Sequence, residues 1–232
     1  MVLTIKYISS VVPGCCDISS ADISEFLSVE QDGLRGILPE VNTIFVIGHH
    51  IQSSLEWAWF PFETERNKTT CAADLHAKAI VEKISYLLMK NGYKSAIIPY
   101  PGRCGIQFKN IAQTTGIGQM GDSFLILHPV WGPWIHLRVI LTDAKIKGQN
   151  RTLNREICIH CGKCVSSCPG KVIGDGTFDG LLCDQTQLKM AEETDHSVYN
   201  YKCEICVRAC PIGIKPPEIN IKQGIRPKPM AK

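Results

Sequence analysis

The chain has 232 residues, 44% of them hydrophobic, and a formal net charge of +3, which suits one large domain or one domain with a small module. So mild a positive charge does not indicate a nucleic-acid partner, and no apolar run reaches the roughly 18 residues of a membrane span. The N-terminus lacks the features of a signal peptide, so we expect a cytoplasmic protein from an oxygen-poor organism, with its twelve cysteines reduced.

The first 40 residues carry few periodic signals. Ser19 or Ser20 is placed to cap a short helix that ends near Ser28. Cys15 and Cys16 are adjacent, which fits either a redox or metal-binding pair or two small, partly buried side chains. We favour the second interpretation.

A short apolar run at 42–48 contains several β-branched residues and predicts a buried strand. It ends at His49 and His50, for which an ordinary pair at the end of a strand is favoured over contact with a metal or substrate. The following stretch, 55–62, is dense in aromatic side chains. Such rings line cofactor pockets or cap a core, and the sequence favours neither.

Residues 70–91 repeat apolar side chains at helical spacing, and Gly92 stands where a left-handed cap belongs, so a helix is predicted there. A strand is predicted at 95–99 and a helix from about 106. Cys104, beside Arg103, is interpreted as a bystander rather than a catalyst.

Three glycines, Gly116, Gly118 and Gly121, then form a G-x-G-x-x-G pattern that lets the backbone approach a ligand or turn sharply. A nicotinamide fingerprint lies between a strand and a helix in that order. Here a helix comes first and a strand follows, so nicotinamide binding is rejected.

Two strands are predicted after these glycines, at 123–127 and at 135–142, and they are expected to pair antiparallel. The second alternates apolar and polar residues. It is therefore expected to be half-buried, with His136 and Arg138 on its solvated face.

Eight of the twelve cysteines lie between residues 158 and 210. The first run is C-x2-C-x2-C-x3-C-P, which in two-cluster ferredoxins wraps [4Fe–4S] clusters, and the second is C-x2-C-x3-C-P. The second run is one cysteine short, and a lone cysteine between the runs completes eight. In order, these residues are Cys158, Cys161, Cys164, Cys168, Cys183, Cys203, Cys206 and Cys210.

Each cube needs four thiolates, and in two-cluster ferredoxins the cysteine before the proline ligates the other cluster. One cluster is therefore assigned to Cys158, Cys161, Cys164 and Cys210, and the other to Cys168, Cys183, Cys203 and Cys206. Four-cysteine zinc sites need neither a third cysteine at the same short interval nor two C-P ends, and a disulfide framework suits neither the spacing nor the compartment.

Composition divides the chain into three parts. Residues 1–150 form an α/β domain, 151–215 a two-[4Fe–4S] ferredoxin-like module, and 216–232 an extended, proline-rich tail. The expected fold class is α+β, with a first part of helices and mostly antiparallel strands followed by the ferredoxin-like module.

The glycine pattern, the strands around Gly132 and Trp134 and the two cysteine runs, in this order, resemble the catalytic core of epoxyqueuosine reductases and reductive dehalogenases. The resemblance runs from about Val41 to Pro211. It implies a nitroreductase-like core with a mostly antiparallel sheet, which binds cobalamin beside two [4Fe–4S] clusters. It also implies that the backbone at the three glycines approaches the corrinoid.

The chain departs from that family pattern in three places. Gln119 and Asp122 stand where the glycine motif normally carries a tryptophan and a basic residue. Gly102 and Arg103 stand where epoxyqueuosine reductases place a proton-donating aspartate. The helical repeats that grip tRNA in those enzymes have no counterpart, so neither family substrate transfers.

Two functions remain open. The chain either passes electrons from its clusters to a bound corrinoid, as a reductase or a corrinoid-reducing protein, or carries electrons without a corrinoid. The expected partner is a ferredoxin- or flavodoxin-type donor or a corrinoid protein, without nucleic acid or membrane. The sequence does not indicate an oligomeric state.

Overall fold

The computed structural model describes residues 3–57, 59–61, 69–100, 102, 106–147, 151, 153, 155–174, 176–193 and 203–217. Arg103, Cys104 and the tail beyond Pro217 lie outside this part of the chain, so the expectations for them are not addressed. Within the described residues, no helix combines the length and the apolar character needed to cross a bilayer.

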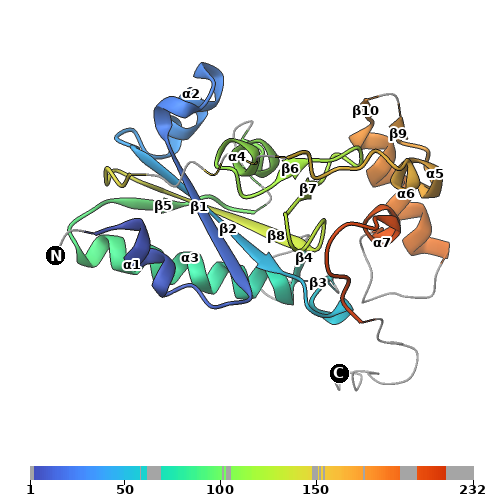
Figure 1. The fold of residues 1–232 in the computed structure, drawn as a ribbon, viewed down its shortest axis with the longest axis horizontal. Helices are drawn as coiled ribbons and strands as arrows, with labels where there is room; N and C mark the ends of the chain where they lie inside the picture. The colour runs from blue at the N-terminus through green and yellow to red at the C-terminus, as the bar shows by residue number, and fades with distance from the viewer. Residues whose placement is uncertain are drawn as a thin grey trace, which may run out of the picture.

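A four-stranded antiparallel sheet forms the centre of the molecule, in the order β1-β2-β8-β5. Its strands are β1 (Cys16–Asp22), β2 (Thr43–His50), β8 (Ile135–Thr142) and β5 (Ser95–Ile97). Every residue of β2 and β8 is buried, because helices cover both faces of these two central strands (Figure 1). The mixed α/β architecture and the strands predicted at 42–48, 95–99 and 135–142 are thus confirmed.

One face of the sheet packs against α3 (Ala72–Lys90) and α1 (Ile5–Ser10). Ala77, Val81, Ile84 and Leu88 recur on the buried side of α3, which confirms the predicted amphipathic helix. Gly92 follows its end with φ +82°, the left-handed conformation that glycine adopts without steric cost.

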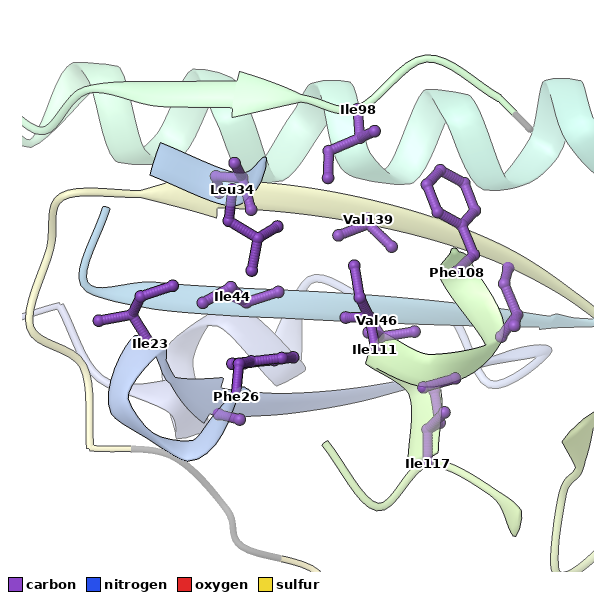
Figure 2. Close-up of a cluster of buried hydrophobic side chains, with 14 of the residues drawn as sticks. Ile23, Phe26, Leu34, Ile44, Val46, Ile98, Phe108, Ile111, Ile117 and Val139 are labelled. Atoms are coloured by element: carbon purple, nitrogen blue, oxygen red, sulfur yellow. The ribbon is translucent and has the colours of Figure 1, made fainter. Parts of the chain in front are cut away.

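The other face carries the larger apolar cluster, which joins the sheet to α2 (Ser28–Ile37) and α4 (Phe108–Thr114). Figure 2 shows Leu34, Phe108 and Ile111 directed from these helices toward Val46 and Val139 of the central strands. The helix predicted from about residue 106 is therefore confirmed as α4. A short 3-10 turn, η1 (Ile23–Glu25), with Asp22 and Glu25 in a capping box, connects β1 to α2.

Two predictions about this core are wrong. Ser19 and Ser20 do not cap a helix but lie buried in the strand β1, where Ser19 Oγ donates to Thr115 Oγ1 at 2.8 Å. The segment 123–127 forms only the two-residue β7 (Ile126–Leu127), which pairs with β6 (Gln119–Met120) and not with β8. Both edges of β8 are already occupied, by β2 and β5.

The remaining elements are short. The turn η2 (Ser54–Trp57) leads to the hairpin of β3 (Trp59–Pro61) and β4 (Thr69–Cys71). After the core come α5 (Lys163–Ser167), the hairpin β9 (Ile173–Gly174) and β10 (Thr177–Phe178), α6 (Gly180–Glu193) and α7 (Ile205–Ala209). These last elements gather at one end of the sheet, on the right of Figure 1. Three of the eight clustered cysteines lie within them, and the other five lie in the residues that flank them.

Candidate metal centres and their junction with the core

The first group of cysteines surrounds a single cavity. Cys158, Cys161 and Cys164 line it together with Cys210, which arrives from beyond the end of α7. The chain can turn this tightly because His160 and Gly162 both have positive φ, at +50° and +68°. The structure thus brings together the four residues that the sequence assigns to one cube.

The second group consists of Cys168, Cys183, Cys203 and Cys206. Burial, together with the neighbouring Cys203, Cys183 and Cys168, raises the pKa of the Cys206 thiol to about 12. The thiols of this group are thus close enough to repel one another as thiolates. Four such thiols become stable as thiolates only beside a cation, which is the environment that an iron–sulfur cube provides.

Each run of the sequence contributes its last cysteine to the group formed mainly by the other run. Cys168 follows α5 yet belongs to the second group, and Cys210 follows α7 yet belongs to the first. The helices α5 and α7 pack against each other, so the residues that follow them, Cys168 and Cys210, leave from neighbouring helices. The donor set fits two [4Fe–4S] clusters, whose ligation remains a prediction.

The glycine pattern packs against the chain itself. A Cβ atom at Gly116 would lie 2.1 Å from the Arg151 carbonyl oxygen, and one at Gly118 would lie 2.5 Å from Ile126 Cγ2. At Gly121 it would meet Leu127 Cδ1 at 2.7 Å and approach Cys158 Sγ to 3.7 Å. Internal packing therefore accounts for glycine at all three positions, and contact of their backbone with a corrinoid remains a prediction.

The two residues that depart from the family pattern bind the cysteine-rich segment. Gln119 Oε1 accepts a hydrogen bond from the Ile157 amide at 2.8 Å. Asp122 Oδ1 lies 2.8 Å from His160 Nδ1, whose pKa is raised by the hydrogen bonds to Glu156 and Asp122. These polar contacts fix the first cysteine run against the core.

A small apolar cluster joins the second cysteine group to the core. Trp134 and Ile51 pack with Val207 of α7, and the partly buried Cys206 and Trp57 lie against them. The Arg208 guanidinium lies 5.7 Å from the Trp134 ring centre. The second cysteine group therefore adjoins the core through aromatic and aliphatic side chains.

Two buried polar atoms at this junction have no hydrogen-bond partner among the described residues, Trp134 Nε1 and His50 Nε2. The His50 ring stacks on Trp131 at 4.9 Å between ring centres. Leaving a buried donor unsatisfied costs about 1–3 kcal/mol. The two atoms thus mark a place where a polar ligand gains hydrogen bonds.

Backbone contacts also fasten the junction. Gly132 and Gly213 have φ of +59° and +82°, and a Cβ at Gly132 would lie 2.1 Å from the Ile212 carbonyl oxygen. Only glycine permits this approach, since any side chain would push the two segments apart. The segment after Cys210 is in this way held against the turn before β8.

We expect Gly132→Ala to weaken this junction. The added methyl group has to displace the 210–213 segment, so cluster iron should become accessible to a chelator several-fold faster than in the unaltered protein. The measurement is iron release to a chelator under anaerobic conditions, beside thermal melting. Gly92→Ala is the matched control, because Gly92 also has positive φ but nothing within 4 Å of a Cβ. Equal iron release from both variants would contradict the expectation.

His136 and Arg138 are buried, contrary to the expected solvated face, and both bind Asp74 of α3. His136 Nε2 lies 2.7 Å from Asp74 Oδ1, while Arg138 donates from Nε at 2.8 Å and from Nη2 at 2.6 Å. Burial alone would raise the pKa of Asp74, but the hydrogen bonds from His136 and Arg138 outweigh it and lower the pKa to about 2. Tyr100 lies over this network, 4.8 Å from the His136 ring centre.

Sequence reasoning missed three polar residues, namely Asp74, Glu56 beside His49, and Lys109. Lys109 Nζ donates to the Phe124 carbonyl at 2.9 Å and lies 5.4 Å from the Phe178 ring centre. Burial lowers the pKa of this amine, and the nearby Cys183 acts in the opposite direction. A cation beside the second cysteine group favours electron uptake there by partly offsetting the negative charge of a thiolate-bound cluster.

Comparison with known proteins supports the resemblance drawn from the sequence. A 4Fe-4S binding domain model (Fer4) matches residues 152–174. Epoxyqueuosine reductases from Listeria monocytogenes and Lactococcus garvieae are 29% and 30% identical over 108 residues. The match spans 44% of this chain but only 28% and 30% of those two proteins.

Solved structures share the fold over most of the chain. Epoxyqueuosine reductase from Streptococcus thermophilus aligns with a TM-score of 0.63 and 18% identity, covering 92% of this chain and 66% of that one. An epoxyqueuosine reductase bound to a modified tRNA stem loop aligns with a TM-score of 0.63 and 20% identity. The alignment covers 89% of this chain and 63% of that protein. A reductive dehalogenase whose structure suggests a mechanism for B12-dependent dehalogenation aligns with a TM-score of 0.54 and 16% identity. The alignment covers 74% of this chain and 26% of that protein.

Proposed function

We propose that this chain is an iron–sulfur reductase whose two [4Fe–4S] clusters pass electrons to a corrinoid at the junction described above. The observation that carries the proposal is the arrangement of the two cysteine groups. The first lines a cavity and includes the exposed Cys161, while the second packs against the aromatic junction with the core. Electrons from a ferredoxin- or flavodoxin-type donor would thus enter at the first group and leave from the second.

The junction offers features that suit a corrinoid. Cobalamin carries several amide side chains, which supply both acceptors and donors for unpartnered groups such as Trp134 Nε1 and His50 Nε2. Bound there, it supplies a cobalt ion that exchanges single electrons with its surroundings. The similarity to a B12-dependent dehalogenase supports the same cofactor.

The chain's own residues contribute burial, charge and position. The cluster of Ile51, Trp134 and Val207 excludes water between the second cysteine group and the core. Arg208, which is paired with the buried Glu204, places a cation beside the Trp134 ring. This low-dielectric surrounding strengthens each electrostatic interaction made at the junction.

A second function is favoured by a specific observation. Gln119, Asp122 and the three glycines all serve internal contacts, which suits a chain that transfers electrons to a partner's corrinoid and binds none itself. The tRNA stem loop seen with one relative is not carried over to this chain, since the match covers less than a third of the two curated relatives.

The deciding experiment is anaerobic titration of the cluster-loaded protein with cobalamin, followed by absorption spectroscopy. We expect the corrinoid spectrum to shift to the base-off form, and Trp134→Phe to bind about tenfold more weakly, because it keeps an aromatic ring but loses the indole hydrogen-bond donor. The iron content of the ligand-free variant should match the unaltered protein, while its melting temperature should fall because the smaller ring leaves a cavity at a fully buried position. If saturating cobalamin leaves the spectrum unchanged, electron transfer without a corrinoid becomes the better account.

A further inference from the structure

His49, at the end of β2, is contacted at both ring nitrogens. Its Nδ1 lies 3.3 Å from Cys16 Sγ, and its Nε2 lies 2.8 Å from Glu56 Oε2. The residue is only 3% exposed. None of these residues belongs to the two cysteine groups or to the junction.

The strand register sets this arrangement. Cys16 and His49 are direct cross-strand partners in the β1–β2 ladder, which brings their side chains to the same face. The neighbouring Cys15 is fixed by its carbonyl oxygen, which accepts a hydrogen bond from the His50 amide at 2.8 Å. As a result, Cys15 Sγ, Cys16 Sγ and a ring nitrogen of His49 all lie within 4.8 Å of one another.

Glu56 selects the tautomer of His49. A carboxylate only accepts hydrogen bonds, so the proton of the neutral imidazole is placed on Nε2. Nδ1 is then left with a free lone pair directed at the Cys16 thiol. Histidines that ligate metals are oriented by a carboxylate on the far ring nitrogen in this same manner.

We propose that Cys15, Cys16 and His49 bind a zinc ion through two thiolates and Nδ1, with Glu56 as the orienting carboxylate. In a tetrahedral site with Zn–S near 2.3 Å and Zn–N near 2.0–2.1 Å, the donors stand about 3.5–3.8 Å apart. The distance from Cys16 Sγ to His49 Nδ1 is 3.3 Å, and all three donor atoms lie within 4.8 Å of one another. Small side-chain movements would bring them to the tetrahedral spacing.

The donor chemistry favours zinc over the common alternatives. Two thiolates and an imidazole form a soft set that selects zinc over magnesium or calcium. Three protein donors leave a tetrahedral ion one position for water or for a substrate atom. The adjacent cysteines, interpreted from the sequence as packing residues, thus acquire the metal-binding role that was left as the alternative.

A different set on the far side of the same ring competes with this assignment. His49, Glu56 and the exposed His76 also place ligand atoms within 4.8 Å of one another. That set would need Nε2 as a ligand, which requires breaking its hydrogen bond to Glu56. The sulfur content of the bound metal's coordination shell separates the two possibilities.

The test uses the full chain with its iron–sulfur clusters loaded, kept anaerobic, and given zinc chloride followed by a weak chelator. We expect about one zinc per chain by elemental analysis, and zinc-edge X-ray absorption showing two sulfur and two lighter neighbours at the distances above. Cys15→Ser and Cys16→Ser should lose zinc with unchanged iron content. Glu56→Gln should keep the same neighbours but bind about 10–100-fold more weakly.

Cys71→Ala is the matched control, because Cys71 is a buried free cysteine outside all three groups, and it should bind zinc as the unaltered chain does. The proposal is overturned if the double variant of Cys15 and Cys16 retains zinc, which would indicate an adventitious ion. It is also overturned by a shell of nitrogen and oxygen alone, or by a Cys15–Cys16 disulfide that excludes zinc under the same anaerobic conditions. Iron content and circular dichroism establish that each variant is folded.

Discussion

Anaerobically prepared protein should contain about eight iron atoms per chain, as two [4Fe–4S] clusters. Replacing two cysteines of one group should remove one cluster, whereas replacing one cysteine of each group should remove both. The critical pair of variants is Cys161→Ala with Cys210→Ala, which should keep about four irons, and Cys161→Ala with Cys168→Ala, which should keep almost none. Iron and acid-labile sulfide analysis, with electron paramagnetic resonance after reduction, measures both.

These two double variants separate the proposed arrangement from the simpler one. If each run of the sequence bound its own cluster, Cys161 and Cys168 would share a cube and the second variant would keep half of its iron. The crossing of Cys168 and Cys210 between α5 and α7 predicts the reverse. Cys71→Ala should keep all of the iron, because Cys71 belongs to neither cysteine group and its thiol is buried in the apolar cluster of the core. If both double variants kept about half of their iron, the proposed crossing would be refuted.

The sequence predicted which cysteines lie together partly because the spacing within each run is local, while their binding of iron stays a prediction. Spacings of two and three residues fix which thiols can reach one cube, and the proline after each run fixes where the chain leaves it. The structure brings Cys210 to the same cavity as Cys158 although 52 positions separate them in the chain numbering. The long-range pairing of Cys210 with the first run was predicted from the known ligand exchange in two-cluster ferredoxins, and not from local spacing.

The elements whose signals are periodic were also predictable. The helix α3 and the strands β2 and β8 follow from apolar spacing over eight or more residues. The edge strand β1 was not predicted, since its serines resemble a helix cap locally and are buried only because Thr115 and β2 lie beside them. The pairing of β7 failed for a related reason, because β8 finds its partners far away in sequence.

The polar networks could not be predicted at all. Asp74 meets His136 and Arg138 across 62 and 64 positions, and a single carboxylate at the start of a helix gives no sign of such partners. An alternating strand was interpreted as half-solvated because the second covering layer, α3, does not show in the pattern of β8. The burial of charged side chains on such a strand can be recognised only once the position of the covering helix is known.

Replacing Asp74 by alanine should lower the free energy of unfolding by about 3–5 kcal/mol, the cost of leaving one member of a buried ion pair without its partner. The Arg138 side chain is 8% exposed and the Asp74 side chain 9%, so water cannot substitute for the lost carboxylate. The stability of Asp74→Asn should fall between that of the unaltered protein and that of Asp74→Ala. The asparagine side chain keeps the shape and one acceptor but loses the charge. Thermal and denaturant unfolding of the cluster-loaded protein, followed by circular dichroism, measures the difference.

The pH of that measurement follows from the depressed pKa of Asp74, which is about 2 in the folded chain against the usual 3.8. A carboxyl group of this kind contributes its full stabilisation above the unfolded value and loses it as the pH falls from about 4 toward 2. Neutral pH therefore shows the whole effect and also preserves the clusters. Asp32→Ala, which removes an exposed carboxylate from α2, should change stability by less than about 0.5 kcal/mol. A loss at Asp74 no larger than that would mean that the network behaves as a solvated surface pair and does not hold α3 to the sheet.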